Sequence, residues 1–128
     1  KLASAKANDM MAGIKHIGDV ELVTAQLDGM TANDLKTAAD DIKAKMNAGV
    51  VVLASDTDDK ITFVAMATKE AVKMGAHSGN IIKEITQIAG GRGGGKPDMA
   101  QGGGKDANKI DDALARVDEI VLTQTVQN

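Results

Sequence analysis

The stretch VVVLASDTDDKITFVAMA, residues 50–67, determines the fold class of this chain. Val50–Ala54 is continuously apolar, as in a strand that is buried on both faces of a sheet. Ser55–Asp59 is a polar turn, and apolar residues then alternate along Ile61–Ala67 with the period of a strand. The stretch therefore predicts a β-hairpin at the centre of the molecule.

The segments on either side of this hairpin predict helices and further strands. Thr31 is suited to begin a helix and Gly49 to end it, because apolar residues recur at helical spacing between them. Ser78 and Asp106 are suited to cap two later helices. The expected strands lie at 14–17 and 20–27 and the expected helices at 31–46, 78–89 and 106–122, with a loop or short helix at 69–77. This order predicts an α/β (α+β) fold, in which helices pack against a small mixed β-sheet.

The composition fits one ordinary domain of 128 residues, with 43% hydrophobic and 26% charged residues. The chain has no cysteine, so disulfides and thiolate chemistry are excluded. No apolar run approaches the ~20 residues that span a bilayer, so no membrane partner is expected. Nothing in the sequence indicates secretion, and a cytoplasmic location is expected. The alanine-rich start, KLASAKAND, lacks an initiator Met and is interpreted as a cut within a longer protein.

The charge is distributed unevenly along the chain. Residues 60–105 carry seven basic and three acidic side chains, whereas residues 1–59 carry six basic and ten acidic ones. Residues 106–128 are again acidic, and the formal net charge is −3. The local field steers an anion more than the net charge does, so an anionic partner is expected to meet the middle third of the chain.

The segment GGRGGGKPDMAQGGG, Gly90–Gly104, lies within this basic third and holds eight of the fourteen glycines. Glycine is unfavourable inside packed helices and strands, because it loses the most backbone freedom on folding, so a loop is expected here. Ala100–Gln101 is expected to add an edge strand. Clustered main-chain N–H groups beside Arg92, Lys96 and Lys105 suit a surface that receives an anion. RNA phosphate is the favoured anion. The chain has a single aromatic residue, so contacts to the RNA backbone are expected in place of base stacking.

Two nucleotide-binding motifs come close to this segment and fail. Gly90, Gly95 and Lys96 fit G-x-x-x-x-G-K, but Pro97 stands where a Ser or Thr must bind magnesium. A dinucleotide fingerprint that starts at Gly91 fails as well, because its third glycine would fall on Lys96. The two histidines are far apart, and no nucleophile is paired with a base. The sequence therefore predicts no catalytic residue, metal site or cofactor in this chain.

The glycine-rich segment and its flanks resemble the C-terminal domain of alanyl-tRNA synthetases, which is also called the DHH-associated domain. The pattern Gly-Gly-x-Gly-Gly-Gly-Lys/Arg-Pro-x-x-Ala-Gln is specific to the synthetase branch. The phosphoesterase branch has a shorter glycine–histidine motif, whereas residue 92 here is Arg. Ser78 replaces an alanine that is usual in the family. The further matches are the helix start HSGNIIKE at 77–84, the hairpin at 50–68 and the closing helix at 106–122, so that the resemblance covers about 14–122.

The resemblance implies a globular domain at 13–128, preceded by the end of a helical, coiled-coil-like segment at 1–12. It also implies a noncatalytic module of an alanine–tRNA ligase that grips the outer corner, or elbow, of tRNA. The partners would be tRNA and the upstream aminoacylation and editing domains of the same chain. The expected RNA-binding residues are Arg92, Gly93, Gly94, Gly95, Lys96, Gln101, Lys105, His77 and Lys73.

Two other functions stay open on the sequence alone. One is the substrate-binding domain of a DHH-type phosphoesterase that acts on oligonucleotides. The other is a dimerisation module that uses the exposed faces of the first and last helices to form a homodimer.

Overall fold

The computed structural model describes residues 15–17, 20–57 and 60–126. The strands are β1 (Lys15–Ile17), β2 (Val20–Gln26), β3 (Gly49–Thr57), β4 (Lys60–Ala67), β5 (Arg92–Gly95) and β6 (Met99–Gly104). The helices are α2 (Ala32–Lys43), α3 (Lys69–Lys73), α4 (Ser78–Ile88) and α5 (Ile110–Val126), with a short 3-10 turn at Ala107–Lys109. The predicted strands, helices and mixed sheet are confirmed, and the segment after β4 is a short helix. The expectation that Gly49 ends the first helix is wrong, because α2 ends at Lys43 with Ala44 as its C-cap and Gly49 begins β3.

The six strands form one sheet in the order β1-β2-β3-β4-β6-β5. The predicted central hairpin is confirmed, because β3 and β4 pair antiparallel from Val50 opposite Ala67 to Thr57 opposite Lys60. β2 and β3 are parallel, and α2 connects them. The remaining neighbours are antiparallel, so the sheet is mixed.

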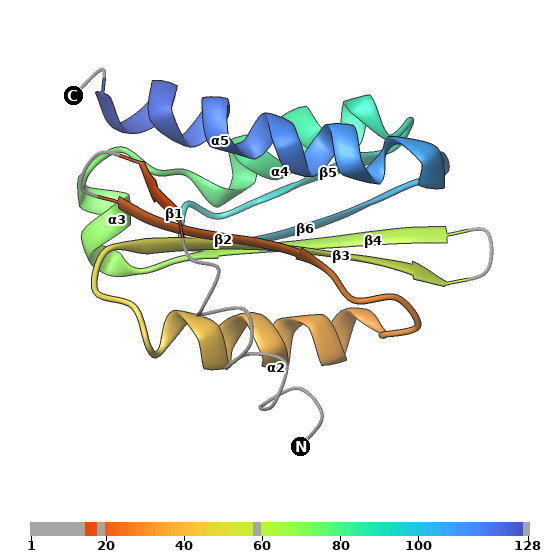
Figure 1. The fold of residues 1–128 in the computed structure, drawn as a ribbon, viewed down its shortest axis with the longest axis horizontal. Coiled ribbons are helices and arrows are strands. Elements are labelled where there is room, and N and C mark those ends of the chain that lie inside the picture. Colours follow the sequence, from red (N-terminus) through yellow and green to blue (C-terminus); the bar gives the residue numbers. More distant parts are fainter. Residues whose placement is uncertain (1–14, 18–19, 58–59, 127–128) are drawn as a thin grey trace.

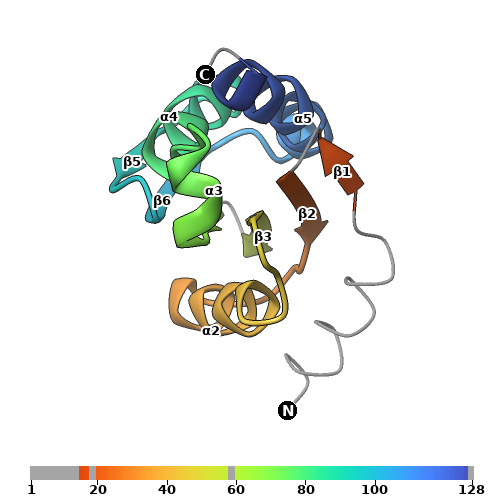
Figure 2. The same ribbon diagram turned by 90° about the vertical axis from the view of Figure 1, so that its left-hand side faces the viewer.

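Helices cover the two faces of the sheet, as Figures 1 and 2 show. α2 covers one face, where Leu35, Ala38 and Ile42 pack with Val51 and Leu53 of β3 in one hydrophobic cluster. α4 and α5 cover the other face. Their apolar residues pack with alternate residues of β2, β3 and β4 in a second cluster, which includes Phe63, Ile81, Ile85, Val117 and Val121.

The expectation of a loop at Gly90–Gly104 is wrong, because this segment forms β5 and β6. β6 pairs with β4 over its whole length, and β5 pairs with β6 from Arg92 opposite Gly103 to Gly95 opposite Ala100. Ala100 and Gln101 do lie in a strand, but the edge of the sheet is β5. The physical reason is that tertiary packing outweighs the low intrinsic strand propensity of glycine.

Close contacts between β5 and β6, together with the packing of α4 on them, explain most of these glycines. A β-carbon at Gly93 would lie 2.5 Å from the Ile82 side chain, and one at Gly91 would lie 1.8 Å from a carbonyl oxygen. A β-carbon at Gly95 would lie 2.8 Å from the Cα of Ala100. At Gly90, which follows the end of α4, the reason is instead a φ of 75°. The fold itself therefore explains why glycine stands at these positions, independently of any ligand.

Two helix starts differ from expectation. Ser78 is the first residue of α4, and His77 is the N-cap, with its Nδ1 accepting a hydrogen bond from the N–H of Asn80 (3.1 Å). Asp106 accepts from the N–H of Asn108 and so begins the 3-10 turn that precedes α5. Thr31 caps α2 as predicted, through the N–H of Asp34.

The predicted helical segment 1–12 lies outside the described residues, so the structure does not test it or the boundary at residue 13. Among the described helices, none combines the length and apolar character that crossing a membrane requires.

Candidate nucleic-acid interface

The hydrogen-bond register between β5 and β6 determines which main-chain groups of β5 face the open edge of the sheet. The N–H of Lys96 donates to the carbonyl of Met99 across the turn between the two strands (2.9 Å). The N–H of Ala67 donates to the carbonyl of Asp98 (2.9 Å). Because bonding alternates along an antiparallel ladder, odd-numbered residues of β6 bond to β5 and even-numbered ones bond to β4.

This alternation leaves part of the β5 main chain facing outward. Arg92 and Gly94 stand opposite odd-numbered residues of β6, so their N–H and C=O groups point into the sheet. Gly93 and Gly95 therefore direct their N–H and C=O groups away from β6, at the open edge. Both of these glycines are exposed, and the carbonyl of Gly95 lies against the start of α4 at Gly79.

Three cations surround a hollow at one end of the β5–β6 hairpin. Lys60 at the start of β4, Arg92 at the start of β5 and Lys105 just after β6 line it together with main chain of Gly103 and Gly104. All three side chains belong to exposed residues. Among the described residues, no acidic one lines the hollow, so it suits an anion.

Lys96 lies at the other end of the hairpin, in the turn that meets α4. The carbonyl of Lys96 accepts from the N–H of Gly79 (3.2 Å), and the carbonyl of Pro97 accepts from the N–H of Ser78 (2.9 Å). The Nδ1 of His77 accepts a hydrogen bond from the N–H of Asn80. The first N–H groups of α4 are thus bonded within the protein and are not free to bind an anion.

The predicted RNA-binding residues thus fall into two groups. Arg92 and Lys105 lie together in the hollow, whereas Lys96 and His77 lie at the opposite end of β5. Lys73 belongs to α3 and forms an ion pair with Glu70 (3.7 Å), which partly compensates its charge. The remaining predicted residues, Gly93, Gly94, Gly95 and Gln101, form the ribbon between the two ends.

The cations of the hairpin are free of acidic partners. Within the described part of the chain, Lys60, Arg92, Lys96 and Lys105 take part in no ion pair, unlike Lys109, which pairs with Asp112. Unpaired exposed cations are available to phosphate without first breaking an internal contact.

Lys60 is the residue that the sequence interpretation missed. It was counted in the basic third of the chain, but it begins β4, 32 positions before Arg92, and lines the hollow beside the β5–β6 hairpin. The pairing of Ile61 with Gly104 brings Lys60 to the glycine strands. The only sequence signal was its charge, because the strand order that joins β4 to β6 cannot be read from spacing.

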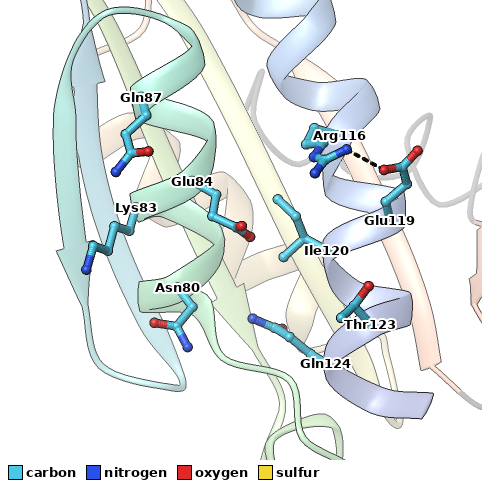
Figure 3. A pocket seen from close by; sticks show the side chains of 9 residues that line it. All are labelled: Asn80, Lys83, Glu84, Gln87, Arg116, Glu119, Ile120, Thr123 and Gln124. Atoms are coloured by element: carbon cyan, nitrogen blue, oxygen red, sulfur yellow. Dashed lines mark hydrogen bonds and ion pairs between the residues drawn. The ribbon is translucent and has the colours of Figure 1, made fainter. Parts of the chain in front are cut away.

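A second hollow lies between α4 and α5 (Figure 3). Its lining contains two cations, Lys83 and Arg116, and two anions, Glu84 and Glu119, together with Ile120. Arg116 and Glu119 form an ion pair. No predicted RNA-binding residue lines it. Among the described residues, no group of three or more His, Asp or Glu side chains could hold a metal ion.

Comparison with known proteins identifies the family of this chain. Residues 19–123 match the model of the DHHA1 domain. The chain is 46% identical over 119 residues to an alanine–tRNA ligase of Natranaerobius thermophilus and 46% identical over 127 residues to that of Alkaliphilus oremlandii. These matches cover 93% and 99% of this chain but only 14% of each relative.

Solved structures give the same result. The crystal structure of the C-Ala domain from Aquifex aeolicus alanyl-tRNA synthetase superposes with a TM-score of 0.79 at 31% identity, covering 85% of this chain and 97% of that one. An exopolyphosphatase-related protein from Bacteroides fragilis shares the fold at 12% identity and a TM-score of 0.57, covering 96% of this chain and 35% of that one. The chain therefore belongs to the DHHA1 domain family, in the group of the C-terminal domains of alanyl-tRNA synthetases.

Proposed function

We propose that this domain binds the elbow of tRNA through the β5–β6 hairpin and the cations at its two ends. The observation that carries the proposal is the placement of Lys60, Arg92, Lys96 and Lys105 around the glycine-rich β5–β6 hairpin. Within the described residues, these four cations are unpaired. Phosphates of folded RNA can approach the glycine main chain closely, and the cations neutralise them. Such contacts position RNA and carry little base information.

The similarity to alanine–tRNA ligases supports tRNA as the RNA. A domain that holds the elbow would keep the acceptor end available to aminoacylation and editing domains elsewhere in the parent chain. Deleting the domain from a full-length ligase is expected to weaken both alanylation and the deacylation of mischarged tRNA. An unchanged rate of both reactions would contradict this role.

The binding proposal is tested with a triple variant, Lys60→Ala, Arg92→Ala and Lys105→Ala. Fluorescence titration with tRNA at low salt is expected to show at least about tenfold weaker binding, because three phosphate contacts are lost. The matched control also removes three cations, Lys36→Ala, Lys43→Ala and Arg116→Ala, since Lys36 and Lys43 lie on α2 and Arg116 on α5, away from the hairpin. Equal affinities of the two variants would overturn the proposal.

Footprinting then tests where on the tRNA the domain binds. Protection is expected at the corner where the two loops of the L-shaped molecule meet. A short single-stranded oligonucleotide is expected to compete poorly, whereas the substrate-binding domain of a phosphoesterase would favour it. Protection confined to the acceptor end would rule out the elbow.

A further inference from the structure

We propose that the open edge of β5 at Gly93 and Gly95 recognises ribose 2′-hydroxyls, so that the domain distinguishes RNA from DNA. The inference rests on the proposed function, because it assigns a chemical task to one part of the same surface. Phosphate binding by Lys60, Arg92 and Lys105 does not by itself distinguish the two nucleic acids. The 2′-hydroxyl is the group that does.

The edge offers both donors and acceptors. Gly93 directs its N–H and its C=O outward, and Gly95 directs its N–H outward about 7 Å further along the strand. Within the described residues, none of these three groups has a hydrogen-bond partner. Neither glycine has a side chain of its own, and both residues are exposed.

This mixture fits a hydroxyl better than a phosphate. A phosphate oxygen can only accept, so it would use the N–H of Gly93 while lying close to the carbonyl oxygen of the same residue, which repels it. A 2′-hydroxyl both donates and accepts, so it can satisfy the N–H and the C=O of the edge together. The glycine edge thus complements ribose, and the cations complement phosphate.

The cations at the two ends favour a nucleic acid over a protein strand as the occupant of this edge. Arg92 precedes the edge with Lys60 and Lys105 beside it, and Lys96 follows it. A sugar–phosphate backbone laid along β5 would meet a cation, then the hydroxyl-binding groups, then another cation. A peptide strand would gain main-chain bonds only from Gly93 and Gly95, because Arg92 and Gly94 bond to β6.

The protein side of this contact cannot be tested by substitution. A β-carbon at Gly93 would lie 2.7 Å from the Cα of Gly102, and one at Gly95 would lie 2.8 Å from the Cα of Ala100, so either variant would disturb the hairpin. The ligand is therefore changed instead. The 128-residue chain is titrated with a tRNA and with the same tRNA carrying 2′-deoxyriboses at the nucleotides that the footprint identifies.

We expect the deoxy substitutions to weaken binding about tenfold, which corresponds to the loss of one or two hydrogen bonds. A native gel and a melting curve of the deoxy tRNA control for its fold. Equal affinities for the two tRNAs would overturn the inference and leave the proposed function standing. Failure of the unmodified tRNA to bind would overturn both.

Amide NMR of the same samples gives an independent measurement. In the free domain, the N–H groups of Gly93 and Gly95 are expected to exchange with solvent faster than that of Gly94, which bonds to β6. Added tRNA is expected to shift and protect Gly93 and Gly95 and to change Gly94 less. If tRNA binds and the amides of Gly93 and Gly95 stay unchanged, the edge is not the contact, and a peptide becomes the better candidate for it.

Discussion

Gly79, the second residue of α4, lies against the carbonyl oxygen of Gly95 in β5. An added β-carbon at Gly79 would lie 2.5 Å from that oxygen and 3.0 Å from the carbonyl carbon. The N–H of Gly79 also donates to the carbonyl of Lys96, the next residue along. The helix and the edge strand are therefore held at a distance that only glycine permits, and this contact positions the proposed RNA-binding edge.

Replacing Gly79 by alanine is expected to destabilise the domain by about 1–3 kcal/mol, because main-chain atoms must move to admit the methyl group. Urea unfolding of Gly79→Ala measures the loss. Asn80→Ala is the matched control, since its main-chain N–H, and not its side chain, bonds to His77. Equal stability of Gly79→Ala and the natural chain would show that α4 can shift away from β5 without cost.

The sequence predicted the fold well where periodicity was strong. The apolar run at Val50–Ala54 and the alternation that follows it predicted the central hairpin. The isoleucines at helical spacing in 78–89 predicted α4. Gly90–Gly104 was misjudged because the preference of single residues was applied without the helix that packs on them. Ile82 explains why Gly93 and Gly102 can form strands here, since α4 fills the space that side chains would otherwise occupy. Such a contact between distant elements leaves no local signal.

The candidate site was predicted in part for the same reason. Arg92, Lys96 and Lys105 share one segment, so the sequence grouped them, but the structure divides them between the two ends of a hairpin. Lys60 joined the group only through the pairing of β4 with β6. Sequence reasoning grouped these cations by their place in the chain and could not predict how the fold arranges them.

Replacing Ser78 by alanine is expected to stabilise the domain, whereas replacing Gly79 destabilises it. The side chain of Ser78 is fully buried, and its Oγ has no hydrogen-bond partner among the described residues. A buried hydroxyl without a partner costs free energy, so Ser78→Ala is expected to raise the free energy of unfolding by about 1 kcal/mol. Thermal unfolding measures the change, with Thr62→Ala as a partly exposed control. A lower melting temperature for Ser78→Ala would mean that the hydroxyl is bonded in solution.

Gln124 of α5 holds the start of α4 through two hydrogen bonds to the main chain of His77. Its Oε1 accepts from the N–H of His77 (2.9 Å), and its Nε2 donates to the carbonyl of His77 (3.2 Å). Gln124→Ala is expected to lower the free energy of unfolding by about 1–3 kcal/mol, because it leaves both main-chain groups without this partner. Gln124→Met keeps the length of the side chain and removes both hydrogen bonds, so it is expected to lose nearly as much. A much smaller loss for Gln124→Met than for Gln124→Ala in urea unfolding would assign the effect to the side-chain stem.

The last prediction concerns Lys60 and the salt dependence of RNA binding. Each phosphate that a cation neutralises releases counterions, so it adds about 0.7–0.9 to the slope of log affinity against log salt. Lys60→Ala is expected to reduce that slope by about one unit and to weaken binding equally for different tRNAs, because a phosphate contact carries no base information. Lys36→Ala on α2 should leave the slope unchanged. A slope that falls equally in both variants would mean that Lys60 acts through the overall charge of the domain and not through a phosphate at the hollow.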